Sequence, residues 1–585
     1  MSRDVLAGLD EQQLAAASVL RGPVCVLAGA GTGKTRVITH RIAHGVETGA
    51  YSPGRVMAVT FTAKAAGEMR GRLRALGVEG VAARTFHATA LAQLNFFWPQ
   101  LAGDTAPSIV DKKVRVLGQA ADGLGLRLDA ATLRDAASRI EWRKVAMRSI
   151  EQDAHAHPSG LGGLDAGTLA DLMRAYEKLK DERRQLDFED VLLACAGMLE
   201  SEPRVAAAVH EQYRHLTVDE FQDVSPVQHR LLELWLGDRR DLCVVGDASQ
   251  TIYSFAGADP RYLLDFAHRF GDATVVRLER NYRSDPAILA VANALMRGRP
   301  GALALSSPRE PGPAPAVRAY PDDDAEAAGV ADAIAAQLAS GASPEQIGVL
   351  YRANAQSAPL LAALAARGIA STVLGGTRFF DLPEVRQAVM ALRGASVAPV
   401  ETTLAAAVRD VLRSLGLSND PPPAGGALRD AWEARAAVLR LAEQAPDGTT
   451  LRAFTDELIA RGRSQHEPAL RTVTLATLHA AKGLEWDHVH LVGLAEGLLP
   501  ISYASSLEQI DEERRLAYVG ITRAARSLSL SWSQQSGARP RARSRFLDEI
   551  GAGPIVSAGA APRGRGTGTA GGGGARATSG ARRGR

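Results

Sequence analysis

Residues 28–35 read Ala28-Gly29-Ala30-Gly31-Thr32-Gly33-Lys34-Thr35, and this stretch decides the fold. An apolar run at residues 24–27 precedes it and has the composition of a buried parallel strand. Apolar residues then recur at helical spacing from residue 37 to residue 43. A strand, a glycine-rich turn and a helix form the context in which a Walker A pattern binds phosphate. The sequence therefore predicts a nucleoside triphosphate site, although Ala28 stands where the pattern has its first glycine.

The residue types of this loop suit phosphate binding. Glycines allow backbone N–H groups to surround phosphate oxygens, and the helix N-terminus adds a partial positive charge. We expect Lys34 to reach the β- and γ-phosphates and Thr35 to offer its hydroxyl to Mg²⁺. The alternative interpretation is a flexible turn between strand and helix that binds nothing.

Strand-like and helix-like segments alternate along the rest of the chain. A strand ends at residues 59–62, residues 244–250 and 274–284 each run from an apolar strand into a turn, and a second block of this kind begins near residue 346. Such alternation is typical of doubly wound parallel sheets, whose ligands bind at the carboxyl ends of the strands. The predicted fold class is α/β with two parallel sheets.

A second chemical centre follows the strand-like residues 216–218. Asp219 and Glu220 end this strand, downstream of the glycine-rich loop, which suits a Walker B element. We expect Asp219 to hold Mg²⁺ through water and Glu220 to orient and deprotonate the attacking water. Surface acids at a strand end are the alternative, and the upstream loop weakens it.

The composition, 46% hydrophobic and 23% charged over 585 residues, predicts a soluble globular protein of three or four domains. No apolar run is long enough to span a membrane, and the N-terminus lacks a signal-peptide pattern, so we expect a cytoplasmic, nucleoid-associated protein without membrane partners. Cys25, Cys195 and Cys243 lack metal-ligand spacing and are expected in the core, with no structural zinc.

Positive charge is concentrated at the C-terminal end. Residues 551–585 contain six arginines and no acid, so the rest of the chain carries a net charge of −3 against +3 for the whole. Any groove for nucleic acid in the body must arise from local charge placement. We expect this Gly/Arg-rich tail to be disordered; it either adds salt-dependent affinity for nucleic acid or serves only solubility.

These motifs together resemble the UvrD/Rep/PcrA group of superfamily 1 DNA helicases, over residues 9–547. The segments that match the family's motifs, in order, are residues 9–13, 28–35, 59–69, 85–88, 218–223, 245–258, 278–284, 350–357, 375–380, 477–485 and 512–524. The number and order of these matches make the resemblance specific.

The resemblance implies two RecA-like cores, each interrupted by a helical insertion. The implied boundaries are residues 1–94 and 186–280 for core 1A, 95–185 for insertion 1B, 281–385 and 471–550 for core 2A, 386–470 for insertion 2B, and 551–585 for the tail. The region 386–470 is shorter than in typical relatives.

The resemblance also assigns roles around bound ATP and Mg²⁺. Gln13 would read the adenine edge, Arg36 and Tyr282 would hold the base, and Glu485 would accept from the ribose. Gln250 would sense the γ-phosphate, which Arg283 and Arg523 would reach from the second core. The implied catalytic residues are Lys34, Asp219, Glu220, Gln250, Arg283 and Arg523, and the implied metal ligands are Thr35 and Asp219. The implied nucleotide-binding residues are Gln13, Ala28, Gly29, Ala30, Gly31, Thr32, Gly33, Lys34, Thr35, Arg36, Tyr282 and Glu485.

Single-stranded DNA is gripped by base stacking on aromatic rings while polar groups contact its backbone. By resemblance, Phe61, Tyr253 and Phe255 would face the bases, with Thr62, His87 and His479 near the backbone. The alternative for each is an ordinary core aromatic or a buried, hydrogen-bonded histidine.

The chain departs from the family pattern in two places. Ser254-Phe255-Ala256 stands where Trp followed by Arg is usual, which removes a cation and shrinks a stacking surface. The match is best with a second, actinobacterial-type UvrD branch, whose members often carry a tetracysteine module and an HRDC domain; this sequence has neither.

The predicted function is an ATP-dependent 3′–5′ DNA helicase and single-strand translocase in repair, replication or recombination. Its expected partners are single-stranded DNA, 3′-tailed duplex DNA and a protein partner in DNA repair. The near alternative is a translocase that strips proteins from DNA and unwinds only with a partner. A helicase–nuclease subunit, a transporter-type ATPase and a non-enzymatic DNA scaffold fit less well, since no nuclease domain or Ser-Gly-Gly signature is present and the ATP-site residues are intact.

Overall fold

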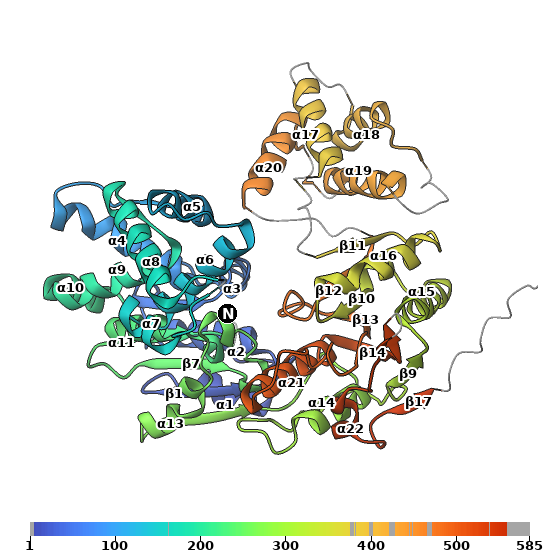
Figure 1. The fold of residues 1–585 in the computed structure, drawn as a ribbon, viewed down its shortest axis with the longest axis horizontal. Coiled ribbons are helices and arrows are strands. Elements are labelled where there is room, and N and C mark those ends of the chain that lie inside the picture. The colour runs from blue at the N-terminus through green and yellow to red at the C-terminus, as the bar shows by residue number, and fades with distance from the viewer. Residues whose placement is uncertain are drawn as a thin grey trace, which may run out of the picture.

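Runs of buried apolar residues form two parallel sheets, as the sequence predicts (Figure 1). The computed structural model describes residues 5–161, 163–374, 380, 382–396, 402–419, 427–443, 445–446, 448–464, 471–536 and 539–558. Residues 375–379 of one predicted motif and residues 559–585 of the predicted tail lie outside the described residues. The predicted α/β fold class with two parallel sheets is confirmed.

The first sheet has six strands in the order β3-β2-β6-β7-β1-β8, and all neighbours are parallel. Its strands are β1 (Val24–Ala28), β2 (Val56–Thr60), β3 (Ala82–Thr85), β6 (His215–Val218), β7 (Leu242–Gly246) and β8 (Thr274–Leu278). The helices around it are α1 (Glu11–Ser18), α2 (Lys34–Glu47), α3 (Ala63–Ala75), α4 (Phe86–Ala102), α9 (Phe188–Ser201), α10 (Pro203–Gln212) and α11 (Pro226–Leu236).

Alternate residues of the four central strands, β1, β2, β6 and β7, pack on opposite layers of helices. In β2, Val56 and Ala58 share a core with α2 and α3, whereas Met57 and Val59 share another with α4, α9 and α11. Because both faces are covered, these strands are apolar throughout rather than alternating. The sheet is therefore doubly wound.

The second sheet has seven parallel strands in the order β11-β12-β10-β13-β14-β9-β17. Its strands are β9 (Ala316–Tyr320), β10 (Ile347–Tyr351), β11 (Ser371–Val373), β12 (Val473–Thr477), β13 (Trp486–Leu491), β14 (Ala524–Ser533) and β17 (Val556–Ala558). The helices around it are α14 (Pro286–Met296), α15 (Asp323–Ala339), α16 (Ser357–Ala365), α21 (Leu507–Ile521) and α22 (Arg545–Ile550).

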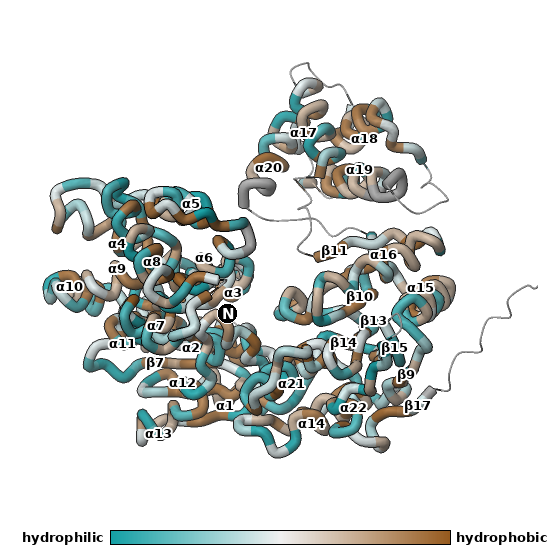
Figure 2. Tube along the Cα trace, in the orientation of Figure 1, coloured by the Kyte–Doolittle hydropathy of each residue, from teal (hydrophilic) through white to brown (hydrophobic). Residues whose placement is uncertain are grey.

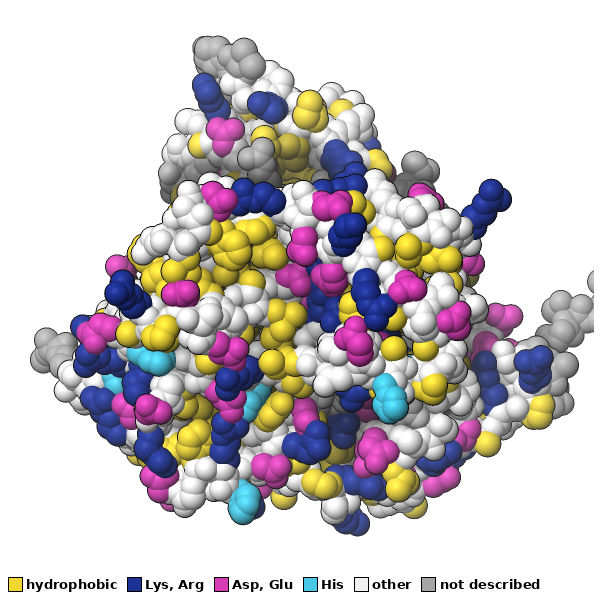
Figure 3. All heavy atoms as spheres, turned by 60° about the vertical axis from the view of Figure 1, so that its left-hand side comes forward, with side chains coloured by type: hydrophobic (Ala, Val, Ile, Leu, Met, Phe, Trp, Pro, Cys, Tyr) yellow, Lys and Arg dark blue, Asp and Glu magenta, His cyan; other side chains and the backbone are white. Residues whose placement is uncertain are grey.

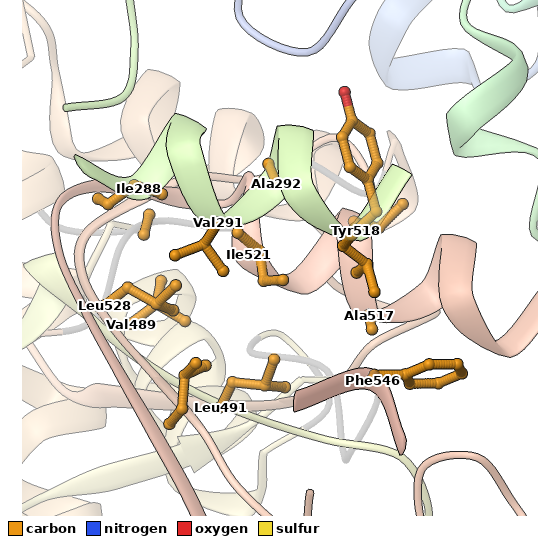
Figure 4. Close-up of a cluster of buried hydrophobic side chains, with 14 of the residues drawn as sticks. Ile288, Val291, Ala292, Val489, Leu491, Ala517, Tyr518, Ile521, Leu528 and Phe546 are labelled. Carbon is orange, nitrogen blue, oxygen red and sulfur yellow. The ribbon is translucent and has the colours of Figure 1, made fainter. Parts of the chain in front are cut away.

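The largest core lies between this sheet and α14, α21 and α22. Figure 4 shows Ile288 and Val291 of α14 facing Val489 and Leu491 of β13. Figure 2 shows the apolar colouring of α14 that this burial requires. Helix α21 shares this core, which fixes the position of the side chains on its other side.

Two groups of helices interrupt the sheets. Between α4 and α9 lie α5 (Lys113–Gly123), α6 (Ala130–Val145), α7 (Ile150–Ala156) and α8 (Ala166–Glu182), which share a core of their own. Between β11 and β12 lie α17 (Pro383–Ala395), α18 (Leu404–Ser414), α19 (Ala427–Glu443) and α20 (Leu451–Ser464), again with their own core. Figure 1 shows this second group standing apart from both sheets.

The structure differs from the predicted boundaries in two places. Helix α4 runs through the expected boundary at residue 94, because its apolar side chains Phe86, Ala90 and Leu94 pack in the core of the first sheet. The tail was expected to begin at residue 551, but Val556–Ala558 forms β17 and pairs with β9, so that starting point is wrong. Within the described residues, no helix has the length and apolarity needed to span a membrane.

Candidate ATP and nucleic-acid site

The glycine-rich loop joins β1 to α2, and its glycines are required by space as well as by backbone geometry. Gly31 and Gly33 have φ of +68° and +87°, the left-handed region that favours glycine. A Cβ atom on Gly31 would lie 2.6 Å from Nδ2 of Asn281, and one on Gly29 would lie 2.3 Å from a methyl carbon of Leu305. The loop is therefore held closely by the segment that follows β8.

Lys34 and Thr35 open α2, with Gly33 as the N-cap residue. The ammonium of Lys34 donates to the carbonyl of Ala28 at 3.4 Å, and the Thr32 hydroxyl donates to the carbonyl of Gly29 at 2.9 Å. Gly33 has no side chain that could accept hydrogen bonds from the first backbone N–H groups of α2. This geometry suits an anion at the helix N-terminus.

The two acids after β6 lie beside this loop. Asp219 is buried, and its Oδ1 accepts from the backbone N–H of Glu220 at 2.9 Å. Burial, reinforced by the Glu220 carboxylate and opposed by Lys34, raises the pKa of Asp219 to about 7. Glu220 has a φ of 54°, which is uncommon outside glycine and reflects a constrained turn that redirects its side chain.

The charges around Glu220 come from both sheets. Burial would raise the pKa of Glu220, but the cations of Lys34 and Lys482 outweigh it and hold the pKa below its ordinary value. Glu220 therefore stays ionised, while the adjacent Asp219 is the more readily protonated acid. Two neighbouring carboxylates with pKa values pushed apart are typical of a catalytic site.

A buried glutamine that the sequence analysis did not single out connects these acids to the next strand. Gln222 is fully buried; its Nε2 donates to Oε2 of Glu220 at 2.6 Å, and its Oε1 accepts from the N–H of Asp247 at 2.9 Å. Oδ2 of Asp247 in turn accepts from Nε2 of Gln250 at 2.7 Å. Hydrogen bonds through Gln222 and Asp247 therefore link Gln250, the predicted γ-phosphate sensor, to Glu220.

The second sheet contributes two arginines that the sequence predicts. Arg523 is buried, and it donates to Oε1 of Gln250 at 3.3 Å and to the carbonyls of Val519 and Leu484. Burial and the charge of Arg283 lower the pKa of Arg523 to about 9. Arg283 donates to Oε2 of Glu485 at 2.5 Å, so the carboxylate expected at the ribose pairs with an arginine here.

The residues predicted to contact the adenine base of the nucleotide also lie together. Nε2 of Gln13 donates to the carbonyl of Thr32 at 2.9 Å, and Arg36 donates to the carbonyl of Gly8 at 2.9 Å. Tyr282 is 40% exposed, and its hydroxyl is hydrogen-bonded to the Asp10 carboxylate. An exposed ring beside Gln13's helix is suited to stacking on a base.

Three further residues were missed because their contacts join distant parts of the chain. Lys482 binds the Asp223 carboxylate and donates to the carbonyl of Gln250 at 2.7 Å. Nδ2 of Asn281 donates to the carbonyl of Ala30 at 2.6 Å. Tyr518 of α21 directs its hydroxyl away from the core in Figure 4, and that hydroxyl lies 3.5 Å from Oδ2 of Asp247. In the sequence, the only sign of these three residues is that they are polar residues within the motifs.

The predicted DNA-contact residues form two clusters. The first cluster contains Tyr253, Phe255 and His479: the Phe255 ring lies 5.7 Å from His479 and 6.0 Å from Tyr253, both edge-on. Phe255 is 64% exposed. The ammonium of Lys482 lies 4.9 Å from the centre of the Tyr253 ring, a cation–π contact.

The second cluster contains His87, Phe61, Thr62 and a residue that the sequence analysis missed, Phe188. The rings of His87 and Phe188 are stacked with centres 3.7 Å apart, and Phe188 remains 56% exposed. Phe61 is half-buried, with its ring 6.0 Å from that of Phe86, and Thr62 caps α3 by accepting from Ala65. Burial lowers the pKa of His87 to about 4, so this ring is neutral.

The surface charge is mixed. Figure 3 shows basic and acidic side chains interspersed over the face turned toward the viewer. Among the described residues, no group of three or more His, Cys, Asp or Glu side chains is arranged to hold a metal ion. The site's recognisable features are therefore the loop, the acids and the exposed rings.

Comparison with known proteins agrees with this geometry. The UvrD/REP helicase N-terminal domain profile matches residues 9–271, and the UvrD-like helicase C-terminal domain profile matches residues 276–401 and 440–535. The chain is 48% identical to ATP-dependent DNA helicase UvrD2 of Mycobacterium tuberculosis over 578 residues, covering 94% of this chain and 82% of that protein.

More distant relatives cover similar lengths. ATP-dependent DNA helicase Rep of Escherichia coli is 30% identical, with 93% of this chain and 94% of that protein covered. ATP-dependent DNA helicase PcrA of Bacillus subtilis is 27% identical, with 94% and 86% covered. Since the two profiles together match more than half of the chain and include all the motifs, the chain belongs to the UvrD/REP helicase family.

Proposed function

We propose that this protein is an ATP-dependent DNA helicase that moves 3′ to 5′ along single-stranded DNA. The observation that carries the proposal is the convergence of both sheets on one site, where Arg523 of the second meets Gln250 of the first at 3.3 Å. The relatives' names describe ATP-dependent DNA helicases. The direction of movement follows from the family resemblance alone.

In this proposal, ATP binds between the sheets with its phosphates on the glycine-rich loop. The oxygen ligands offered by Thr35 and Asp219 suit Mg²⁺, which would neutralise phosphate charge. Glu220 is held ionised, as a base that takes a proton from water must be. Lys34, Arg283 and Arg523 supply the cations that stabilise charge developing on the γ-phosphate.

Coupling to DNA would run through Lys482. This lysine contacts Asp223 and Gln250 on the nucleotide side and the Tyr253 ring on the other. A change in the nucleotide site that moves Lys482 would therefore change the surface offered to bases. Nucleotide binding would close the two sheets together because the closed arrangement binds ATP more tightly.

DNA would bind across the two ring clusters, with bases stacked on Tyr253, Phe255 and Phe188. The domain boundaries proposed are those of the sequence analysis, except that α4 extends the first core to residue 102 and β17 extends the second core to residue 558. Single-stranded DNA and 3′-tailed duplex are the proposed substrates, and a role in repair, replication or recombination in the cytoplasm is the proposed setting.

The test is strand displacement on 3′-tailed, 5′-tailed and blunt duplexes, with ATP hydrolysis followed in parallel. Unwinding of the 3′-tailed duplex alone is expected, and Lys34→Ala should abolish both activities. Hydrolysis stimulated by DNA without unwinding would instead favour the translocase that needs a partner. Hydrolysis insensitive to DNA would refute the motor proposal.

A further inference from the structure

Two buried lysines from the inserted helices meet at the N-terminus of α9. Lys144 of α6 lies 2.7 Å from Oδ2 of Asp187 and 2.6 Å from Oδ1 of Asp190. Lys180 of α8 lies 3.3 Å from Oδ2 of Asp187 and also binds Asp190. Glu177 of α8 accepts from both lysines, at 2.9 Å from Lys144 and 2.7 Å from Lys180. Three helices are thereby joined at one point.

The two lysines and Asp187 are almost fully removed from water, whereas Asp190 and Glu177 are 14% and 29% exposed. The side chains of Lys144, Lys180 and Asp187 are 2%, 3% and 1% exposed. Burial opposes ionisation of Asp187, but the cations of Lys144 and Lys180 outweigh it and hold its pKa far below the ordinary value. The Tyr176 hydroxyl also donates to Oδ2 of Asp187 at 3.1 Å. Both ammonium groups and the Asp187 carboxylate are thus held by several hydrogen bonds and ion pairs each.

Asp187 is also the N-cap of α9. Its side chain accepts from the backbone N–H of Asp190, and the Asp190 side chain accepts from the N–H of Asp187, at 3.0 and 2.9 Å. This reciprocal cap fixes where α9 begins and how its first residue points. That first residue is Phe188, whose exposed ring stacks on His87 at the start of α4.

We propose that Lys144 and Lys180 are positioning residues for DNA binding, which act through the Asp187–Asp190 cap to hold the Phe188 ring against His87. This inference rests on the proposed function, because it assumes that Phe188 stacks on a base. Without a lysine, the buried carboxylates would lose a partner and the first turn of α9 would shift, taking the ring with it.

The alternative is that the cluster only stabilises the joint between the inserted helices and the first sheet. A double-mutant cycle separates the two roles. Lys144→Met and Phe188→Ala are made singly and together, and the concentration of oligothymidylate that half-saturates ATP hydrolysis is measured. We expect each single change to raise that concentration about fivefold or more. We expect Lys144→Met to add less than about twofold when Phe188 is already absent.

Asp187→Asn serves as a second variant if Lys144→Met does not fold, because asparagine keeps the N-cap while removing the charge. It should behave in the same way in the cycle. Arg139→Met is the matched control: Arg139 pairs with buried Asp153 within the same helices, at 2.9 Å from Nε to Oδ2, and does not contact Asp187. This control should leave the DNA concentration unchanged.

The outcomes separate cleanly. The positioning role would be overturned if Lys144→Met raised the half-saturating DNA concentration by the same factor with and without Phe188, or did not change that concentration at all. Either result would leave the helicase proposal intact. No effect of Phe188→Ala would also overturn the positioning role. If DNA fails to stimulate hydrolysis by the unaltered protein, the proposed function fails first, and the inference falls with it.

Discussion

Arg523→Met tests whether the second sheet completes the ATP site. Arg523 is buried, and its hydrogen bonds go to neutral groups: the carbonyls of Val519 and Leu484 and the side chains of Gln250 and Thr522. Burial and the charge of Arg283 lower its pKa to about 9. Burying a guanidinium among neutral partners costs free energy, which a bound anion would offset.

A cation buried at such a cost is expected to serve a bound anion. Methionine keeps a long unbranched side chain and removes the buried charge, so without nucleotide the variant should melt at the same temperature or higher. ATP hydrolysis stimulated by DNA should fall by about 10³-fold or more, because a cation at the γ-phosphate would be missing in the transition state. Steady-state kinetics and thermal unfolding with and without a non-hydrolysable nucleotide measure both effects.

Arg526→Met is the matched control, since Arg526 lies three residues away, is 70% exposed and pairs with Asp487 at 3.3 Å. It should change neither the melting temperature nor the rate by much, as expected for a surface ion pair. The reasoning would be refuted if Arg523→Met kept a rate within tenfold of the unaltered protein. If Arg523→Met lowered the free energy of unfolding without nucleotide by several kcal/mol, the guanidinium would stabilise the protein without ATP. That result would contradict the expected cost of burying it.

Three other predictions test separate parts of the site. Gly31→Ala should raise the KM for ATP sharply, since its Cβ would lie 2.6 Å from Asn281, whereas Gly49→Ala, with nothing within 4 Å, should cost only backbone strain. Phe255→Ala should leave the unfolding free energy within about 0.5 kcal/mol but raise the DNA concentration for half-saturation about fivefold or more; a stability loss without a DNA effect would contradict a stacking role. Burial lowers the pKa of both His87 and His479 to about 4, so neither ring gains a proton as the pH falls from about 8 to about 6. DNA affinity, measured by fluorescence anisotropy, should therefore not rise over this range through protonation of these rings. The free energy of unfolding should decline as the pH falls below about 6.5, because there the unfolded state binds protons that the folded state does not.

The fold was predictable because its signals are local. The apolar runs at β1, β2, β6 and β7 are buried on both faces, so they appear in the sequence as continuous strands followed by turn residues. The loop at residues 28–35 follows β1 and the two acids follow β6, so both lie at the carboxyl edge of the same parallel sheet, with β7 between the two strands. These features need no knowledge of how the two sheets meet.

The contacts between the sheets were not predictable in the same way. Lys482 and Asp223 are separated by more than 250 residues, and their ion pair exists only because the second sheet docks beside the first. Gln222 gave no signal beyond its position between two acids, although it is the side chain that connects Glu220 to Asp247. The strand β17 was missed because three residues flanked by glycine and proline carry no periodicity.

The departure from the family at residues 254–256 can be judged from the same contacts. The Phe255 ring is steeply inclined to the rings of both His479 and Tyr253 rather than stacked on them, and the residue remains 64% exposed. A base can therefore stack on it as on a larger ring, over less area. The cation missing at Ala256 has a counterpart in Lys482, which lies over the adjacent Tyr253 ring and also binds Asp223. Because Lys482 is attached to the second sheet, its positive charge would move relative to the bases whenever the second sheet moves. The affinity for DNA would therefore depend more directly on the state of the bound nucleotide.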